Sequence, residues 1–398
     1  MDKRSLKYLH KFNTKSSARL NRSLVLGIIK DHSFISRAEI AKLTNMSPAT
    51  VTYILNDLLG KGLVKEVSQG ESTSAGGRKP ILLQINGSNN FVIGIEINLT
   101  KIQGIFADLN GTIISKYSYP FTDKMNPLPD LKKTISKILL KHNDKKDKVL
   151  GIGISAPGII NFDEGEIIYN EYFKWKNIPI TKQLSEEFTI PVYIENDANA
   201  SALGELYFNQ RLNTDTLIYI LIHESLDEKY KYNLIGIGCG IIINNEIFHG
   251  NNWQAGEIHQ SINFMLQNLL SKRPFNSFYK KVEGSITFTK LLNLAKKNDE
   301  IAIRIQNLIA KEVGKIIANA VDLFDPGAVI IGGCVYTIDK NFHNVLIDSF
   351  NKNHASTHSD VKILYSDFGK DSVLMGALAI IFNEIFTSMK TKHSLVFT

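Results

Sequence analysis

Beyond residue 86, apolar runs typical of strands alternate with amphipathic runs typical of helices, and this order occurs twice. The first of these two repeats begins with three β-rich runs joined by short turns, Phe91–Ile97, Ile102–Ala107 and Thr112–Tyr119. Helices and strands alternate after them, over 131–142, 149–155, 180–188, 192–194 and from 198 onward. This order predicts a mixed sheet covered by helices.

The second repeat has the same order of strands and helices. Its strands and its long helix lie at 217–222, 235–248, 300–323, 328–332 and 361–366. Two similar α/β halves predict a cleft between them and a hinge. With 398 residues, 43% of them hydrophobic and 21% charged, the chain has the composition of a folded protein of more than one domain.

The composition also excludes several classes of protein. No apolar run approaches the ~18 residues of a membrane span, and the charged N-terminus has no apolar signal core. We therefore expect a cytoplasmic protein with no membrane partner. Cys239 and Cys334 are too few for a disulfide framework or for a metal site of three or four thiolates.

Positive charge is concentrated near the N-terminus. Residues 1–86 hold 14 Lys and Arg against 6 Asp and Glu, whereas the whole chain has a net charge of +7. The remainder is therefore close to neutral. A small basic module joined to a neutral body suggests a polyanionic partner, and a solvated basic tail is the alternative.

The basic module has the pattern of a winged helix-turn-helix. A helix over 20–31 precedes a helix that Ser36 caps, with Glu39 three residues later completing a capping box. Ser47 then caps a third helix that has Pro48 at its first position. Two alternating strands form the wing, at 63–67 and 81–85. A helical packing domain with a loose hairpin is the alternative.

The third helix is expected to enter the major groove of double-stranded operator DNA. Small and hydroxyl side chains on its outer face allow close approach, and Tyr53 and Asn56 can reach base edges or phosphates. Arg78 and Lys79 follow two glycines and can reach phosphates or a narrow minor groove. The candidate DNA-binding residues are Arg37, Ser47, Ala49, Thr50, Thr52, Tyr53, Asn56, Arg78 and Lys79.

Five short motifs follow one another along the chain: Ser36–Ala41, Gly76–Pro80, Ala156–Gly158, Glu195–Ala200 and Ile331–Gly333. Together they resemble the ROK family (repressor, open reading frame, kinase), in its transcriptional regulators. The resemblance implies an α/β protein in which a winged helix-turn-helix precedes a two-lobed, actin-like body of the sugar-kinase, ribonuclease H-like type. It also implies a homo-oligomer, a dimer or a tetramer.

On this basis the chain divides into four parts. We expect a basic arm over 1–19, a winged helix-turn-helix over 20–86, a first lobe over 87–200 and a second lobe over 201–370 that supports dimerisation. A C-terminal helix over 371–386 is expected to pack back on the first lobe.

Asn196 and Asp197 lie at the end of a predicted strand, where ligands of α/β folds commonly bind. Carboxylates and amides suit sugar hydroxyls, whereas the alternative is a capping Asp beside a packed Asn. In the family's kinases, the residue matching Asp197 takes the proton from the sugar hydroxyl. The candidate effector-binding residues, for a sugar or sugar phosphate, are Pro157, Gly158, Asn196, Asp197, Glu257 and His259.

The chain departs from the family's kinases at two places. Asn98 and Leu99 stand where the first phosphate loop has two glycines, so we expect no ATP cofactor and no catalytic residue, Asp197 serving as the base only if the protein is a kinase. Gln260 stands where the family has its zinc histidine, and 261–284 contains no cysteine. We therefore expect no zinc and no metal site.

Three functions remain open at this point. The first is a DNA-binding transcriptional regulator, here a repressor, that senses a small molecule. The second is a sugar kinase with an added DNA-binding domain, favoured by Asp197 and by the glycine motifs at 236–240 and 332–333. The third is a constitutive DNA-binding protein whose effector pocket has decayed.

Overall fold

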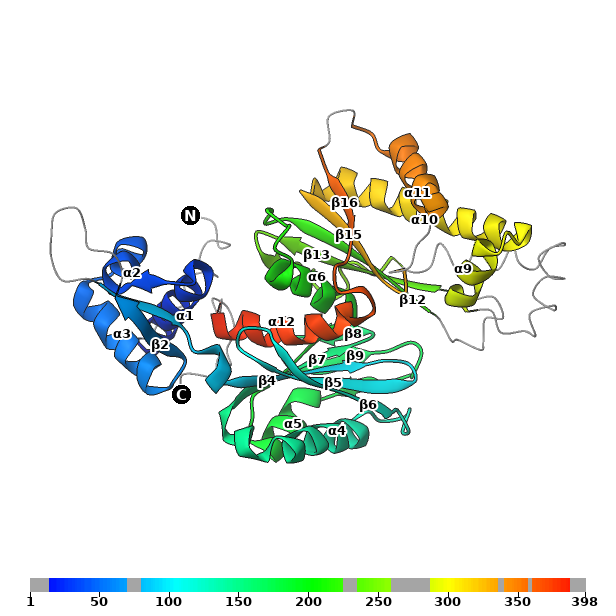
Figure 1. Ribbon diagram of the computed structural model, residues 1–398. Coiled ribbons are helices and arrows are strands. Elements are labelled where there is room, and N and C mark those ends of the chain that lie inside the picture. The colour runs from blue at the N-terminus through cyan, green and yellow to red at the C-terminus, as the bar shows by residue number, and fades with distance from the viewer. Residues whose placement is uncertain are drawn as a thin grey trace, which may run out of the picture.

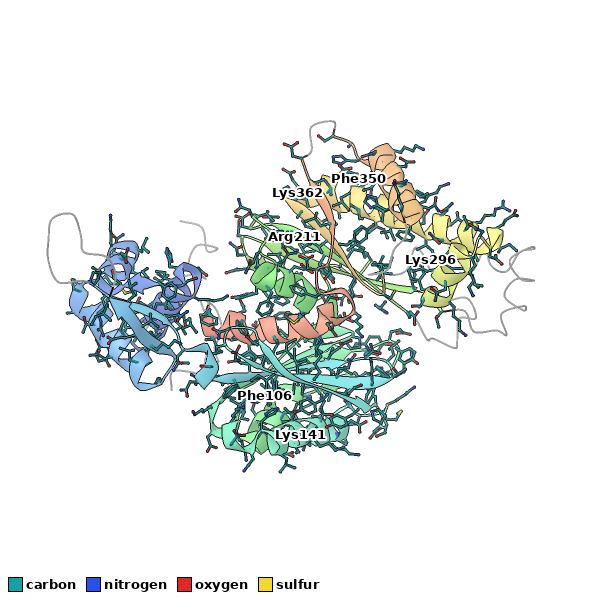
Figure 2. The ribbon with its side chains drawn as sticks, in the orientation of Figure 1. Phe106, Lys141, Arg211, Lys296, Phe350 and Lys362 are labelled. Carbon is teal, nitrogen blue, oxygen red and sulfur yellow. The ribbon has the colours of Figure 1, made fainter. Side chains whose placement is uncertain are left out.

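The computed structural model describes residues 14–69, 80–224, 235–258, 287–335, 340–356 and 360–386. It places a small N-terminal unit beside a larger body of two lobes, and a C-terminal helix lies between the lobes and points toward the small unit (Figure 1). Side chains fill the space around the ribbons, with Phe106 inside one lobe and Phe350 in the other (Figure 2).

The N-terminal unit contains three helices and a small antiparallel sheet. Its elements are α1 (Thr14–His32), β1 (Ile35–Ser36), α2 (Arg37–Thr44), α3 (Pro48–Gly60), β2 (Val64–Gln69) and β3 (Ile81–Ile85). The strands lie in the order β1-β3-β2. This order of helices and strands is that of a winged helix-turn-helix, as predicted.

Local signals in the sequence place the two central helices of this unit. The Ser36 hydroxyl accepts a hydrogen bond from the Glu39 amide, and the Glu39 carboxylate accepts one from the Ser36 amide, so the predicted capping box is confirmed. Ser47 caps α3 through the Thr50 amide, with Pro48 at the first position. Asn45 ends α2 in the left-handed conformation, which turns the chain between the helices.

Most predicted boundaries agree with the structure to within three residues, and two predictions differ from it by more. The first helix begins at Thr14 rather than near Leu20, because residues 14–19 are polar yet contain no Gly or Pro that would end a helix. The single strand expected over 235–248 is two strands, because Asn244 and Asn245 both adopt positive φ and form a tight turn.

The first lobe is built on a five-stranded sheet in the order β11-β7-β4-β5-β6. Its strands are β4 (Phe91–Ile97), β5 (Lys101–Asp108), β6 (Ile113–Pro120), β7 (Val149–Ala156) and β11 (Val192–Asn196). Helices α4 (Leu128–Lys141) and α5 (Ile180–Phe188) cover one face (Figure 1). A small sheet of three strands precedes α5, formed by β8 (Ile159–Asn161), β9 (Glu166–Tyr169) and β10 (Lys176–Ile178).

The second lobe has its own five-stranded sheet in the order β14-β13-β12-β15-β16. The strands are β12 (Leu217–Glu224), β13 (Ile235–Ile243), β14 (Glu246–Ile247), β15 (Ala328–Gly333) and β16 (Lys362–Tyr365). The helices on its outer side are α9 (Phe288–Lys296), α10 (Glu300–Phe324) and α11 (Lys340–Asn353). Three short 3₁₀ helices lie at Gly87–Asn89, Asn143–Lys148 and Gly369–Asp371.

The two lobes share one topology. In each sheet, three consecutive strands pair in antiparallel fashion, and two later strands add in parallel beside the first of them. The predicted duplication of an α/β half is therefore correct.

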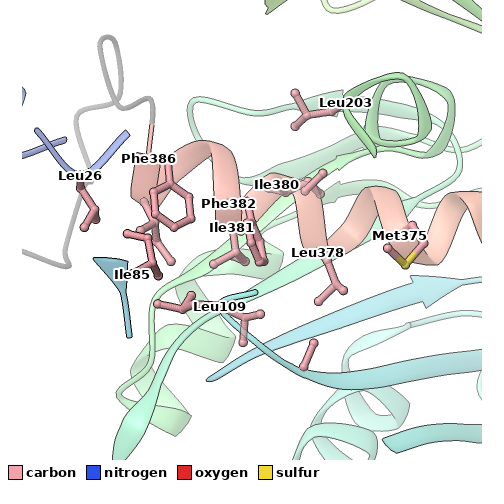
Figure 3. Packing of buried hydrophobic residues seen from close by; sticks show 14 of the residues in the cluster. Leu26, Ile85, Leu109, Leu203, Met375, Leu378, Ile380, Ile381, Phe382 and Phe386 are labelled. Carbon is pink, nitrogen blue, oxygen red and sulfur yellow. The ribbon is translucent and has the colours of Figure 1, made fainter. Parts of the chain in front are cut away.

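Two helices lie at the contact of the lobes, α6 (Asp197–Phe208) and α12 (Ser372–Phe386). α12 is apolar almost all round and is buried along most of its length, which is what a helix enclosed on several sides requires. It packs on β4 and β7 of the first lobe and along α6. One apolar cluster runs from α12 into the N-terminal unit, including Leu26, Ile85, Leu378, Phe382 and Phe386 (Figure 3).

Among the residues that the structure describes, no helix has the length and apolar character that crossing a bilayer requires.

Candidate functional sites

The outer face of α3 presents the side chains that the sequence assigned to DNA contact. Ala49, Thr52, Tyr53 and Asn56 are exposed, Tyr53 at 68%. The opposite face of the helix is buried through Val51, Ile54, Leu55 and Leu58. A helix with one face fixed in the core and the other holding small and polar groups is suited to lie in a major groove.

Four of the assigned residues already have partners within the domain. The Ser47 hydroxyl lies 2.9 Å from the Thr50 hydroxyl and accepts from the Thr50 amide, so this pair shapes the start of α3. Arg37 donates to the Asn56 amide oxygen at 3.5 Å and pairs with Glu66 on β2 at 3.2 Å. Arg37 therefore connects α2, α3 and the wing, close to the exposed face of α3. Arg78 and Lys79 lie outside the described residues.

A second site is centred on the N-terminus of α6. The Asn196 side-chain oxygen caps the helix by accepting from the amides of Ala198 and Asn199, at 2.9 and 3.2 Å. Its amide nitrogen donates to the Gly158 carbonyl oxygen at 3.0 Å. Gly158 has φ +109°, and the Asn170 side chain holds the neighbouring Pro157 carbonyl at 2.9 Å. Asn196 thus holds the turn after β7 against the start of α6.

Asp197 lies beside this cap and is partly exposed. One of its carboxylate oxygens accepts from the Ala198 amide at 2.9 Å. Burial raises the pKa of Asp197 to about 7; the amide of Ala198 opposes this effect, and the negative charge of Glu257 adds to it. The exposed Glu257 of the second lobe and Asp197 of the first are therefore electrostatically coupled. His259 lies outside the described residues.

A buried carboxyl group, Glu96, lies at the end of β4 near Asp197. Burial raises the pKa of Glu96 to about 7, opposed by a hydrogen bond from Asn98 and by the charge of Lys101. The loop after it is closed on itself. The Asn98 side chain donates to Glu96 at 3.3 Å and accepts from the Thr100 amide at 3.4 Å, and the Asn98 amide donates to the Lys101 carbonyl. The amides of Asn98 and Thr100, which a phosphate loop would offer, are thus already used.

Two glycines in the glycine motifs of the second lobe allow close packing of neighbouring elements. Gly240 lies in β13, where a Cβ atom would come within 2.3 Å of the Ala198 carbonyl oxygen on α6. Gly332 lies in β15, where a Cβ atom would come within 1.8 Å of the Tyr219 hydroxyl. Both positions require glycine whether or not a nucleotide binds.

The sequence did not reveal a link between the lobes at His249. Its Nε2 lies 2.7 Å from a carboxylate oxygen of Glu195, which is 1% exposed. The other oxygen of Glu195 accepts from the amide of Asn196 and from the Asn199 side chain. The His249 ring also stacks on Phe162 of the first lobe at 5.8 Å. Histidine and glutamate are far apart in the sequence, so only the tertiary fold brings them together.

Electrostatics favour the charged form of this histidine. Burial alone would lower the pKa of His249. The negative charge of Glu195, its hydrogen bond to the ring and the charge of Asp163 together outweigh burial, and the pKa of His249 is raised. The pair thus stabilises the cap of α6 from behind the candidate effector site.

No group of three or more His, Cys, Asp or Glu side chains in the described part of the chain is arranged to hold a metal ion. Cys239 is buried and Cys334 partly so, and burial raises the pKa of the Cys239 thiol to about 12.

Comparisons with known proteins agree with the predicted arrangement. Residues 92–384 match the ROK family, and residues 20–65 match winged helix-turn-helix DNA-binding domains. The xylose repressor of Caldicellulosiruptor bescii is 31% identical over 92% of this chain and 96% of its own length. The N-acetylglucosamine repressor of Escherichia coli O157:H7 is 25% identical over 94% of this chain and 95% of its own length.

Solved structures show the same fold. A ROK family transcriptional regulator, a homologue of the E. coli MLC protein, superposes with a TM-score of 0.78 and 21% identity over 93% of this chain and 97% of its own. A ROK glucokinase from Streptomyces griseus, in complex with glucose and AMPPNP, superposes with a TM-score of 0.57 and 22% identity over 73% of this chain and 99% of its own. The predicted fold class, a winged helix-turn-helix followed by a sugar-kinase-type body, is confirmed.

Proposed function

Because the chain belongs to the ROK family and joins its body to a winged helix-turn-helix, we propose that it is a transcriptional repressor whose operator affinity is controlled by a sugar. The observation that carries this proposal is the exposed polar face of α3. The domain that contains α3 packs on the body through one shared apolar cluster. The proposal agrees with the relatives that match this chain over more than nine-tenths of its length, a xylose repressor and an N-acetylglucosamine repressor.

The DNA-binding role rests on α3 and the wing. Tyr53 and Asn56 are the residues for base contact, and Arg37, Arg78 and Lys79 supply the positive charge for phosphate contact. Ser47 and Thr50 shape the first turn of α3, where the Ala49 amide can donate a hydrogen bond to a phosphate oxygen. A homodimer would place two copies of α3 on half-sites spaced by roughly one or two turns of DNA.

The effector is proposed to bind where Asn196, Asp197 and Glu257 meet, with Pro157 and Gly158 forming the adjacent backbone. Carboxylates accept hydrogen bonds from sugar hydroxyls, and the remaining N–H of Asn196 can donate to a ring or hydroxyl oxygen. Asp197 belongs to the first lobe and Glu257 follows the last hairpin strand of the second. A ligand held by both would draw the lobes together.

The second candidate, a sugar kinase with an added domain, is favoured by Asp197 alone. That residue lies where a base for the sugar hydroxyl is needed, and a carboxylate with a pKa of about 7 can take a proton near neutral pH. Against it, the amides of Asn98 and Thr100 already have acceptors, and Gly240 and Gly332 are explained by packing. We therefore propose binding without phosphoryl transfer.

Fluorescence anisotropy on the DNA upstream of the protein's own gene, compared with random duplex across a salt series, tests the proposal. A preference of about 10³-fold or more for the upstream fragment is expected of a specific regulator. Addition of D-xylose or N-acetylglucosamine should then change the affinity by about 5–150-fold, the usual range of coupling. Sugar-dependent ATP hydrolysis together with no DNA binding at any salt concentration would replace the proposal with the kinase.

A further inference from the structure

The last turn of α1, in the DNA-binding domain, places Lys30 against three aromatic rings of the body. The ammonium nitrogen lies 4.1 Å from the centroid of the Tyr207 ring, 5.0 Å from that of Phe386 and 5.8 Å from that of Phe382. A cation within about 6 Å of a ring centroid is attracted by the electrons of the ring face. We call these four residues the Lys30 box.

The box lies in a contact that is otherwise apolar. Leu26 on α1 is fully buried and Phe386 is 5% exposed, and both belong to the apolar cluster that continues along α12 (Figure 3). Burial lowers the pKa of Lys30 to about 8, with the charge of Asp31 acting in the opposite direction. The rings compensate the ammonium for part of its lost hydration. The cation–π interaction of Lys30 therefore depends on the positions of these three rings.

The Tyr207 ring comes from α6, the helix that begins at the candidate effector site. Asp197 and Tyr207 are at opposite ends of α6, about 15 Å apart at about 1.5 Å per residue. The Tyr207 hydroxyl donates to Asn383 of α12 at 3.1 Å, so the ring is oriented by both helices.

α6 and α12 touch through their backbones, which leaves no room for one to slide independently of the other. A Cβ atom on Gly376 of α12 would come within 2.3 Å of the Ala200 carbonyl group on α6. A Cβ atom on Gly204 of α6 would come within 3.0 Å of the Gly376 nitrogen. Displacement at one end of α6 is therefore carried to its other end and to α12.

We infer that α6 connects the effector site to the DNA-binding domain: a ligand on Asn196 and Asp197 displaces α6, and Tyr207 changes its contact with Lys30 of α1. This inference rests on the proposed effector site and adds the route by which its occupancy alters the position of α3. The alternative is that the Lys30 box only adds to the stability of the domain contact.

Matched substitutions separate the two roles. Tyr207→Phe keeps the ring and loses the bond to Asn383, whereas Tyr207→Leu loses the ring. Lys30→Arg keeps the cation, whereas Lys30→Met removes it at similar length. For each full-length variant, operator affinity is measured by anisotropy with and without D-xylose and, separately, N-acetylglucosamine, and sugar binding is measured by calorimetry.

We expect the ratio of operator affinities with and without sugar to fall from at least about 5-fold to less than about 2-fold in Tyr207→Leu and Lys30→Met, while both still bind sugar. Tyr207→Phe and Lys30→Arg should keep most of the ratio. A full ratio in Tyr207→Leu, or an equal loss in Tyr207→Phe and Tyr207→Leu, would overturn the inference. A stability change without a change of ratio would assign the box to domain packing.

If neither sugar shifts the operator affinity of the unaltered chain, the proposed sugar response fails, and hydrogen exchange still tests the connection. Asn196→Ala removes the side-chain cap of α6 and so perturbs the start of the helix without any ligand. It should change the exchange rates of α1 amides near Lys30 in the unaltered background but not in the Tyr207→Leu background. Unchanged α1 exchange in both backgrounds would show that α6 transmits nothing to the DNA-binding domain.

Discussion

Replacing His249 should weaken both the folded state and the effector site, by an amount that depends on pH. His249→Ala leaves one oxygen of the buried Glu195 carboxylate without its 2.7 Å partner. The other oxygen keeps its two donors, from Asn196 and Asn199, so the carboxylate still accepts two hydrogen bonds. The loss should therefore be about 2 kcal/mol, within the ~1.5–3 kcal/mol of a hydrogen bond to a charged group and below the ~3–5 kcal/mol of a broken buried pair.

The sign of the pH dependence follows from the direction of the pKa shift. Because the pKa of His249 in the folded protein is raised above its ordinary 6.5, mainly by Glu195 against the opposing effect of burial, folding favours the protonated ring. The stabilisation is therefore fully present below pH 6.5 and is lost as the pH rises through the folded-state pKa. The difference in unfolding free energy between the unaltered chain and His249→Ala should shrink over that range.

Urea unfolding at a series of pH values between about 5.5 and 9 measures this difference. The protein has two tryptophans, and Trp253 lies 4.9 Å from the His249 ring, so its fluorescence also reports protonation of the imidazole. His354→Ala is a matched control, because His354 also pairs with a carboxylate, that of Asp322, but neither residue belongs to the candidate effector site. A constant difference across this range, or an equal loss of sugar affinity in His354→Ala, would refute the reasoning.

Three further substitutions test the DNA and effector sites separately. Asp197→Ala should abolish the change of operator affinity with sugar and leave operator binding without sugar within about 2-fold, measured by anisotropy; loss of both would contradict separate sites. Tyr53→Ala should weaken operator binding by about 1–3 kcal/mol and leave random duplex unchanged, measured by competition between the two DNAs. Arg78→Ala should lower the slope of log affinity against log salt by about 0.9, and an unchanged slope would remove Arg78 from the interface.

The elements that the sequence predicted well are those with strong local determinants. β4 and α5 occur at the predicted residues, and the capped starts of α2 and α3 occur as expected. Each has a complete apolar period or a side chain that caps its own first turn. By contrast, β8, β9 and β10 have three or four residues each, too few for an alternation to be recognised, and they are stable only because they pair with one another.

The position of the candidate effector residues was predictable in part for the same reason. Asn196 and Asp197 follow a recognisable strand, and the strand-to-helix junction is a local feature. His249 and Lys30 carry no such signal, because their partners come from elements distant in the sequence. A histidine after a short hairpin and a lysine near a helix end are usually solvated, and only tertiary packing places one against Glu195 and the other against Tyr207.

Packing alone explains two glycines of the second lobe, without reference to a nucleotide. Gly240 is required because α6 passes directly over β13, and Gly332 because the buried Tyr219 hydroxyl fills the space beside it. Substitution at either position would disturb α6 or the central sheet of the second lobe, whatever the protein binds. The loop at Asn98 contains no glycine, and the hydrogen bonds of the Asn98 side chain to Glu96 and Thr100 close it on itself. The fold therefore does not by itself imply phosphoryl transfer, and we propose that Asp197 and Glu257 serve sugar binding alone.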